Sequence, residues 1–497
     1  MSVKPEFETY SYAGLVTRVK AQSVVECRLA GVGEMNGVLA TRASVVLTSA
    51  EASDGEIRYN GKLLLCIVYE DGDKNVCRME RGAEFTHHAA DEDVTSACNV
   101  RVSLNVLSSV VRREGASFYV SCVVEADVVV CGARTIEYLT GGDALVCRKN
   151  PQKIVKEEYC SGQLEVSDEF ETELIGDVLL HGENVYLQRA ICAAGSLVVS
   201  GEAAVNICAL KDEGPDNYER LLPFRVEIPC DAASAGMLCH ADIRVASANI
   251  SVSSDENKGK SKIAIDVSLA VTGTVYEEEE IPFVADAFSP LYDMSLLRET
   301  RAFERHKDSL RFTERVSGTA SLSSPIDYGC TLQALVLHRA DVNCLVNDVG
   351  EEELQGVVCA TLLVMQSDGI HRGIAVELPF ALPLKTSVAG EKRVSALVCG
   401  MSVRQKREGE AEVEATLKFA VDIFETVEIS FVSALEEGDA VLPSDCAFSV
   451  FLPREGDGLW EIAKTLRKPP EEIVADNPDM TFPVKRGERI VVYHQKC

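Results

Sequence analysis

The residues of this sequence that could do chemistry are its histidines, cysteines and carboxylates. His87 and His88 form an adjacent histidine pair, but neighbouring residues on a strand point to opposite faces and cannot easily share a metal ion. We therefore interpret the pair as part of a polar loop. The acidic runs 91–93 and 277–280 could offer oxygen ligands to calcium, yet no spaced loop of the EF-hand type accompanies them. We expect both runs to form solvated turns.

The eighteen cysteines could form disulfides, bind zinc or stay reduced. No two of them have the C-x-x-C spacing of common zinc sites. Many lie in apolar runs, as Cys66 does between Leu65 and Ile67, where cysteine behaves as a small hydrophobe. Because disulfide frameworks belong to small secreted domains, we predict reduced thiols, no metal site and no cofactor.

Common catalytic motifs are absent from the sequence. It contains no G-x-S-x-G elbow, no P-loop, no H-E-x-x-H and no G-x-G-x-x-G followed by a helical pattern. We therefore predict that the protein is not an enzyme, and we name no catalytic residue. A glycan hydrolase would need two carboxylates in a cleft, and a sequence with 78 acidic residues neither proves nor excludes such a pair.

Length and charge limit the class of protein and its partners. A chain of 497 residues, 46% of them hydrophobic, predicts several folded domains. The formal net charge of −29 repels phosphate backbones and anionic lipid, which disfavours nucleic acid and membrane surfaces as partners. No stretch is long and apolar enough for membrane insertion, and the N-terminus does not resemble an export signal. We expect a cytoplasmic protein.

The elements that must position any site recur along the chain. The segments 55–61, 195–201 and 350–356 each begin and end with glycine and precede an apolar run. We interpret these glycines as turn residues that need positive φ. Downstream, 222–224 and 378–380 both read Leu-Pro-Phe. The sequence therefore indicates three copies of one unit.

Each copy closes with a strictly alternating segment, at 118–127, 262–271 and 412–421. Alternation of this kind predicts an antiparallel sheet with one face on a core. We expect a mainly β protein with three repeated antiparallel modules, each a β-sandwich or a barrel-like unit. The charged segment Tyr292–Arg315 fits a connector helix or a long edge strand, and we expect its face to be solvated. The predicted bounds of the modules are 15–157, 158–312 and 313–440.

The segment 445–497 has a different pattern. The apolar residues of 459–466 have helical spacing, and Asp457 precedes them as a predicted N-cap. Pro469 is expected to open a second helix, which ends at Asn477. The predicted order is βααβ, with strand 447–452, helix 459–466, a short helix from 469 and strand 489–493.

This segment resembles the LysM domain family. The resemblance is carried by Gly456, Asp457, Leu459, Trp460, Ile462, Ala463, Asn477 and Gly487. It implies an α+β domain with a shallow groove for N-acetylglucosamine polymers, although Gly458 stands where sugar-binding members have Ser or Thr. For Trp460 we favour the other interpretation, that its ring belongs to the core of so small a domain. The groove that the resemblance implies, for a protein partner or a glycan, consists of Asp457, Gly458, Leu459, Trp460, Asn477, Pro478, Asp479 and Met480.

The whole arrangement resembles the SipL-like family of clostridial spore morphogenesis proteins. Asp286-Ala287-Phe288-Ser289 looks like the D-A-[YF]-S signature of that family's repeated domain. The resemblance implies a spore-envelope scaffold in the mother-cell cytosol, at the forespore surface. Its LysM domain would dock to the stage IV sporulation protein A ATPase, and its repeats would meet coat proteins. The alternative is an exported cell-wall protein that binds peptidoglycan or a chitin-like glycan.

Overall fold

The computed structural model describes residues 2–30, 34–115, 117–255, 259–327, 329–407, 410–442 and 446–493. Strands make up most of these residues, and the two helices found there are short and lie near the C-terminus. The prediction of a mainly β protein built from antiparallel sheets is confirmed. No helix in the described part is both long and apolar enough to cross a membrane.

Within the described ranges, eighteen strands precede the C-terminal unit, in three consecutive sets of six. The first unit comprises β1 (Lys4–Ala30), β2 (Met35–Ser53), β3 (Glu56–Asp71), β4 (Val76–Ala90), β5 (Asn99–Glu114) and β6 (Ser117–Asp143). The second comprises β7 (Val146–Glu173), β8 (Val178–Ala193), β9 (Ser196–Lys211), β10 (Gly214–Pro229), β11 (Leu238–Asp255) and β12 (Lys260–Phe288). The third comprises β13 (Tyr292–Leu322), β14 (Thr331–Val346), β15 (Glu352–Met365), β16 (His371–Pro383), β17 (Glu391–Arg407) and β18 (Glu410–Ala440).

The first and last strands of each unit pair with each other, as β1 with β6, β7 with β12 and β13 with β18. In the first unit they form the sheet β1-β6-β5, and β2-β3-β4 forms a second sheet. The second unit repeats this order with β7-β12-β11 and β8-β9-β10. In the third, β16 joins β13 through Ser321 and Leu322, so the two parts become one six-stranded sheet.

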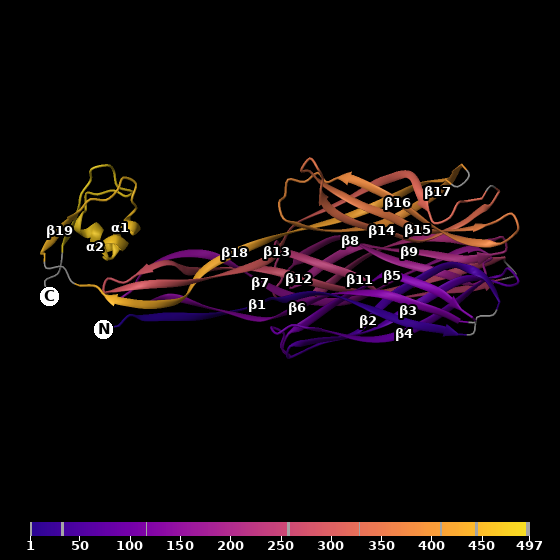
Figure 1. Ribbon diagram of the computed structural model, residues 1–497, viewed down its shortest axis with the longest axis horizontal. Coiled ribbons are helices and arrows are strands. Elements are labelled where there is room, and N and C mark those ends of the chain that lie inside the picture. The colour runs from indigo at the N-terminus through magenta and orange to yellow at the C-terminus, as the bar shows by residue number, and fades with distance from the viewer. Residues whose placement is uncertain are drawn as a thin grey trace.

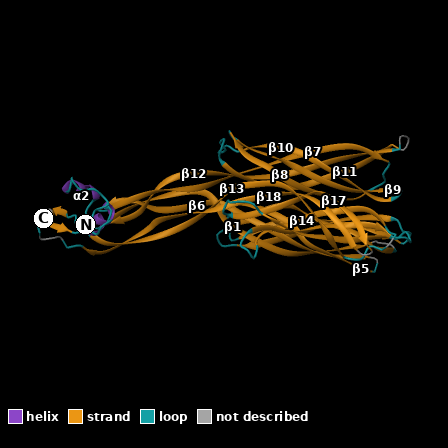
Figure 2. Cartoon of the chain, turned by 90° about the horizontal axis from the view of Figure 1, so that it is seen from above, coloured by secondary structure: helices purple, strands orange, loops and turns teal. Residues whose placement is uncertain are grey.

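The paired strands β1 and β6, β7 and β12, and β13 and β18 extend beyond the other strands toward the C-terminal unit (Figures 1 and 2). We call this extension the stalk and the rest of the eighteen strands the body. Aromatic and aliphatic side chains from all three strand pairs fill its centre, among them Tyr138, Phe283 and Phe431. The rings of Phe283 and Phe431 stack with centroids 5.6 Å apart, and the ring of Tyr138 meets Phe283 edge-on at 4.8 Å. The turns after β6 and β12 lie at the tip of the stalk, beside the C-terminal unit (Figure 1).

The glycine-bounded segments have a different role at each end. The first glycines, Gly55, Gly195 and Gly350, lie in turns with φ between +74° and +86°, as expected. The second glycines are not turn residues, because each lies within a strand opposite a phenylalanine of the next strand. A Cβ atom there would stand 2.4 to 2.6 Å from the ring, so only glycine leaves room for it. These cross-strand pairs are Gly61 with Phe85, Gly201 with Phe224, and Gly356 with Phe380.

The alternating segments form the cores of the units as predicted. The apolar positions of 118–127, 262–271 and 412–421 are at most 1% exposed. They face the second sheet of the same unit, and the two sheets bury one apolar layer between them. Burial of this kind stabilises a strand by roughly 1.5–3 kcal/mol per large side chain.

The predicted module boundaries fall within strands. Residues 157 and 158 lie inside β7, and 312 and 313 lie inside β13, while the units defined by strand pairing meet at 144–145 and 289–291. The segment Tyr292–Arg315 is not a helix but most of β13. Its face is only partly solvated, because Phe303 is buried and Arg311 pairs with Asp422 at 2.8 Å.

The three units also share a core with one another. It contains Leu39 and Val68 from the first unit, Leu179 from the second, and Val336 and Leu363 from the third. Each of these side chains is at most 4% exposed. The body is therefore held together by apolar contacts between units as well as within them.

Candidate functional site: the C-terminal unit at the tip of the stalk

The C-terminal unit, which we call the head, consists of β19 (Phe448–Phe451), α1 (Leu459–Leu466), α2 (Pro470–Asp476) and β20 (Ile490–Tyr493). The two strands pair antiparallel, with Phe448 opposite Tyr493. The expected order of strand, helix, helix, strand is thus present. Its core is made of Ile462, Ala463, Ile473, Val484, Ile490 and Val492, with Phe288 of β12 added from the stalk.

One predicted detail of the head, the N-cap of the first helix, is wrong, and another, the proline that opens the second helix, is confirmed. The N-cap of α1 is Gly458, and it makes no side-chain cap, so the assignment of Asp457 was wrong by one residue. The carboxylate of Asp457 instead accepts a hydrogen bond from the backbone N–H of Arg454 at 2.8 Å. The second helix does have proline at its first position and ends at Asn477, as predicted.

Asn477 is a structural residue of the head. It is buried, and its amide nitrogen donates to the carbonyl oxygens of Ile473 and Val491, each at 2.9 Å. Its Oδ1 accepts a hydrogen bond from the backbone N–H of Val491 at 2.8 Å. Asn477 therefore ties the end of α2 to β20, and these contacts engage both polar atoms of its side chain.

The other predicted groove residues differ in exposure. Pro478 and Asp479 are exposed on the loop after α2, whereas Met480 and Leu459 pack against the core of the head. The backbone N–H of Val484 donates to the carbonyl oxygen of Asp457 at 3.0 Å, so the loop after β19 contacts the loop before β20. Gly458 is half-buried at the start of α1.

Trp460 faces the stalk. Its Nε1 donates to Oδ2 of Asp286 at 2.9 Å, and its ring meets the ring of Phe288 edge-on at 5.4 Å. The guanidinium of Arg148 lies 5.3 Å from the centre of the same ring. The single tryptophan is thus an anchor between head and stalk, since its apolar ring and its N–H are both used there.

Charged groups on α1 extend this contact. Nζ of Lys464 lies 2.9 Å from both oxygens of Asp286, and Arg467 pairs with Asp293. Burial alone would raise the pKa of Asp286, but the hydrogen bonds from Trp460 and Lys464 and the charge of Lys464 outweigh burial and lower this pKa. Asp286 is therefore ionised at neutral pH. We call Trp460, Lys464 and Arg467 of the head, together with Arg148, Asp286, Phe288 and Asp293 of the stalk, the head–stalk contact.

The outer face of the head's two-stranded sheet is apolar and exposed. Phe448 and Val450 of β19 are 59% and 52% exposed, Leu452, which directly follows the strand, is 67% exposed, and Tyr493 of β20 is 54% exposed. Side chains at every second position of a strand share a face, and Tyr493 is the cross-strand neighbour of Phe448. We call these four residues the apolar strip. The opposite face of the sheet packs on the helices.

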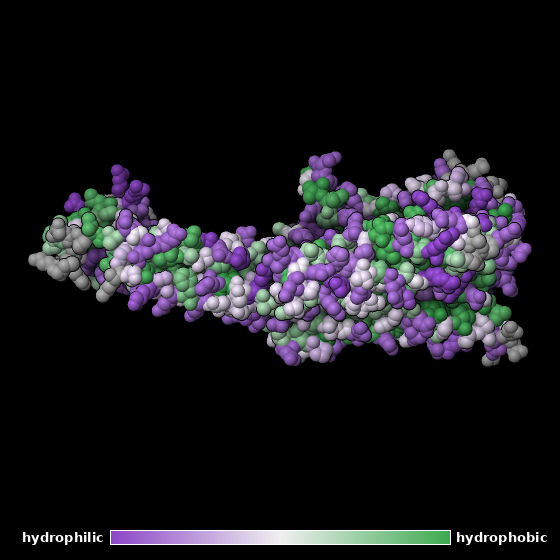
Figure 3. Space-filling model, turned by 60° about the horizontal axis from the view of Figure 1, so that its bottom comes forward, coloured by the Kyte–Doolittle hydropathy of each residue, from purple (hydrophilic) through white to green (hydrophobic). Residues whose placement is uncertain are grey.

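The head also differs from the rest of the chain in charge. Residues 446–497 contain eight basic and eight acidic side chains, so the whole net charge of −29 belongs to residues 1–445. Hydrophilic residues cover much of the stalk and body surface in Figure 3. A neutral head with an exposed apolar strip thus stands on a strongly acidic support.

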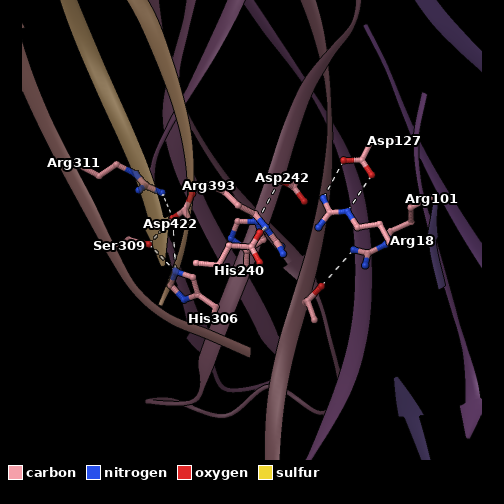
Figure 4. Close-up of polar contacts among 12 residues, drawn as sticks. Arg18, Arg101, Asp127, His240, Asp242, His306, Ser309, Arg311, Arg393 and Asp422 are labelled. Atoms are coloured by element: carbon pink, nitrogen blue, oxygen red, sulfur yellow. Dashed lines mark hydrogen bonds and ion pairs between the residues drawn. The ribbon is translucent and has the colours of Figure 1, made fainter. Parts of the chain in front are cut away.

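A second cluster of polar residues lies in the interior, where the second and third units meet (Figure 4). One ligand-type atom from each of His240, His306 and Asp422 lies within 4.8 Å of the other two. Burial alone would raise the pKa of Asp422, but the neighbouring His306, the charge of Arg311 and a hydrogen bond from Ser309 lower this pKa strongly. Nε2 of His306 itself lies 2.8 Å from Oγ of Ser309. Asp422 is therefore an anionic group in a mostly buried position.

The polar runs named from the sequence lie elsewhere. His87 and His88 are on strand β4 and not in a loop; His87 packs near Tyr59, and His88 is exposed. Residues 91–93 form the predicted turn, but 277–280 belong to β12. There, Glu279 pairs with Lys156. The sixteen cysteines from Cys27 to Cys399 are free thiols, and burial raises the pKa of several, such as Cys66 to about 11.

Sequence reasoning missed the interior cluster and the apolar strip. No local signal joins His240 to Asp422, because they are distant in sequence and belong to different units. The alternation of 448–452 was visible, but it was interpreted only as a strand. Comparisons with models of protein families, with curated proteins and with solved structures find no match to this chain.

Proposed function

We propose that the protein is a non-enzymatic assembly scaffold whose head docks a protein partner through the apolar strip. The single observation that carries this proposal is the exposure of Phe448, Val450, Leu452 and Tyr493 on one sheet face. A few anchors, tyrosine prominent among them, supply most of the binding energy at protein interfaces, and near-neutral contacts around them exclude water. Charged residues are depleted at the centre of such interfaces, which matches the strip.

The head–stalk contact supports the same role. Trp460 and Lys464 hold α1 against the stalk, so the sheet side of the head is turned away from that contact. A binding surface that is held in one orientation loses less freedom on docking. The long stalk separates the head from the body (Figure 1), which leaves the body's surfaces for other partners.

We infer the identity of the partners from the resemblance of the sequence. In this proposal the head is a LysM domain, the chain is a SipL-like spore-envelope scaffold, and the head docks to the stage IV sporulation protein A ATPase on the forespore surface. The body then meets coat proteins in the mother-cell cytosol. The alternative is peptidoglycan or chitin-like glycan as the ligand of the head. Two predicted groove residues favour the protein partner, because Trp460 is engaged by the stalk and Asn477 by β20.

Calorimetric titration of the full chain tests this function. The purified ATPase and an N-acetylglucosamine oligomer serve as the two ligands. We expect binding of the ATPase and a loss of at least tenfold in affinity for Val450→Ser combined with Phe448→Ser. Val474→Ser is the matched control, because Val474 is an exposed apolar residue of α2, 44% exposed, outside the strip. Binding of the sugar alone, or equal loss in the control, would contradict the proposal.

A further inference from the structure

The interior cluster brings together two imidazoles and one carboxylate from three strands. His240 lies on β11 of the second unit, and His306 and Asp422 lie on β13 and β18 of the third. Their side chains are 16%, 10% and 14% exposed. Figure 4 shows the three groups converging in the space between the strands. Strand pairing within one unit does not account for this proximity, because His240 belongs to the second unit and the other two residues belong to the third.

A bulge in β13 positions the third unit's side of the cluster. The register of β13 against β18 shifts between His306 and Asp308, so that His306 faces Phe424 and Ser309 faces Asp422. Asp422 and Phe424 are two residues apart on β18 and therefore share a face. Bulges re-aim side chains in this way and are over-represented beside functional sites. The ring of Phe424 meets both histidine rings edge-on, at 5.0 and 5.5 Å.

The carboxylate of Asp422 keeps one oxygen for a further ligand. Ser309 Oγ donates to Oδ1 at 2.6 Å, Arg311 donates to Oδ1 at 2.8 Å, and Nε2 of His306 lies 3.7 Å from Oδ1. These contacts from the described residues all converge on Oδ1, so the lone pairs of Oδ2 remain for a cation.

A second carboxylate orients His240. Oδ1 of Asp242 lies 3.2 Å from Nε2 of His240, an arrangement that commonly supports a metal-binding imidazole from behind. The Asp242 side chain is 72% exposed, so solvent and ions have a route to the cluster. The carboxylates of Asp422 and Asp242 face two guanidinium groups, those of Arg311 and Arg101. The nearby Arg393 is paired with Glu304 at 2.6 Å and with Glu391 at 3.1 Å.

We propose that His240, His306 and Asp422 bind one divalent transition-metal ion of the Zn²⁺ type, which joins the second unit to the third. Two imidazoles and a carboxylate are a ligand set that such ions accept, with water in the remaining position. Metal–ligand bonds of about 2.1 Å at tetrahedral angles place ligand atoms about 3.4 Å apart. From the 4.8 Å limit found here, the cluster therefore needs to contract by up to about 1.4 Å.

Titration of the full-length, tag-free chain with Co²⁺ and Zn²⁺ tests this site. We expect one ion per chain, a Co²⁺ absorption spectrum of low coordination number, and no thiolate-to-cobalt charge-transfer band. His240→Asn and His306→Asn should each weaken binding at least tenfold, and Asp242→Asn should weaken it about 10–100-fold. His87→Asn is the control, because His87 lies on β4 away from the cluster, and it should leave binding unchanged.

Three results would overturn the proposal. The first is a chain that binds neither ion, and the second is binding that survives both His240→Asn and His306→Asn. The third is a thiolate band, which would assign the metal to cysteines. Far-ultraviolet circular dichroism of each variant separates loss of the site from loss of the fold, and His240→Asn is the decisive variant because the asparagine need not disturb the Arg311–Asp422 pair.

Discussion

Two contacts between large parts of this molecule are built differently. The units of the body meet through a buried apolar core and through buried polar pairs such as Glu70 with His371, in which Glu70 is fully buried. The head meets the stalk through one aromatic pair and partly exposed ion pairs around Asp286. Buried groups left without partners are costly, whereas exposed ion pairs contribute little. The body should therefore unfold as a whole, while the head can detach from an intact stalk.

The largest expected effect comes from the contact between the first and third units. Glu70 of β3 accepts hydrogen bonds from Asn36 at 2.7 Å and from the backbone and ring of His371 on β16. Glu70→Ala removes the common acceptor of these three donors at the contact between units, and it should lower the free energy of unfolding by about 3–5 kcal/mol. Denaturation in urea, followed by circular dichroism, measures this loss.

The matched control for Glu70 is Glu80→Ala. Glu80 is half-exposed and pairs with Arg78 at the surface, so its loss should cost at most about 1 kcal/mol. Similar losses in the two variants would show that the contact between units is not held by its buried polar pair.

The second-largest effect is a dependence of the stability of the body on pH. Burial lowers the pKa of His338, on β14 beside Glu219 of β10, from 6.5 to about 4. Between these two values the unfolded chain binds a proton that the folded chain does not, so stability rises with pH there. Stability should be complete above pH 6.5 and fall by up to about 3 kcal/mol as the pH drops to 4. His338→Gln should flatten the curve over this range, and an unchanged slope would contradict the assignment.

A smaller effect is expected at the head. Trp460→Ala removes the hydrogen bond to Asp286 and the packing on Phe288, and it should weaken the head–stalk contact by about 2 kcal/mol. The midpoint of unfolding of the body should not change. Small-angle X-ray scattering and limited proteolysis between 440 and 448 measure release of the head. Equal loss of stability in the body would show that head and stalk form one cooperative unit.

The smallest effect is the response of the head–stalk contact to acid. The pKa of Asp286 is lower in the folded chain than in the unfolded chain. Its contribution is therefore present above the ordinary aspartate pKa of about 4 and is lost as the pH falls through the lower folded value. A fluorescence-transfer pair on head and stalk should report opening only below about pH 4. Asp286→Asn should remove this transition, and opening near pH 6 would indicate a histidine instead.

Patterns local to one strand or helix were predictable, and contacts between distant strands were not. The alternation in 262–271 and 412–421 placed the cores correctly, because apolar residues at every second position indicate a strand with one buried face. The charged β13 fitted a helix as well as a strand, and its pairing with β18 decided between them. Glycine was recognised at Gly201, but its reason, the ring of Phe224 across the sheet, lies 23 residues away.

The candidate site shows the same division. The element order of the head followed from its local spacing and caps, whereas the partner of Trp460 is Asp286, from another unit. That aspartate lies in the Asp-Ala-Phe-Ser motif, but no residue near it indicates that it contacts a tryptophan 174 residues later. Side chains such as Asn477 also serve the fold with the same atoms that a binding role would use.

Photo-crosslinking from the apolar strip tests the central claim most directly. A photoreactive phenylalanine analogue at position 493 replaces Tyr493, and the same residue at position 474 replaces Val474 on α2. In sporulating cells we expect a protein adduct containing the sporulation ATPase from position 493, and none from position 474. An adduct with glycan, or equal yields of the ATPase adduct from the two positions, would contradict docking through the strip.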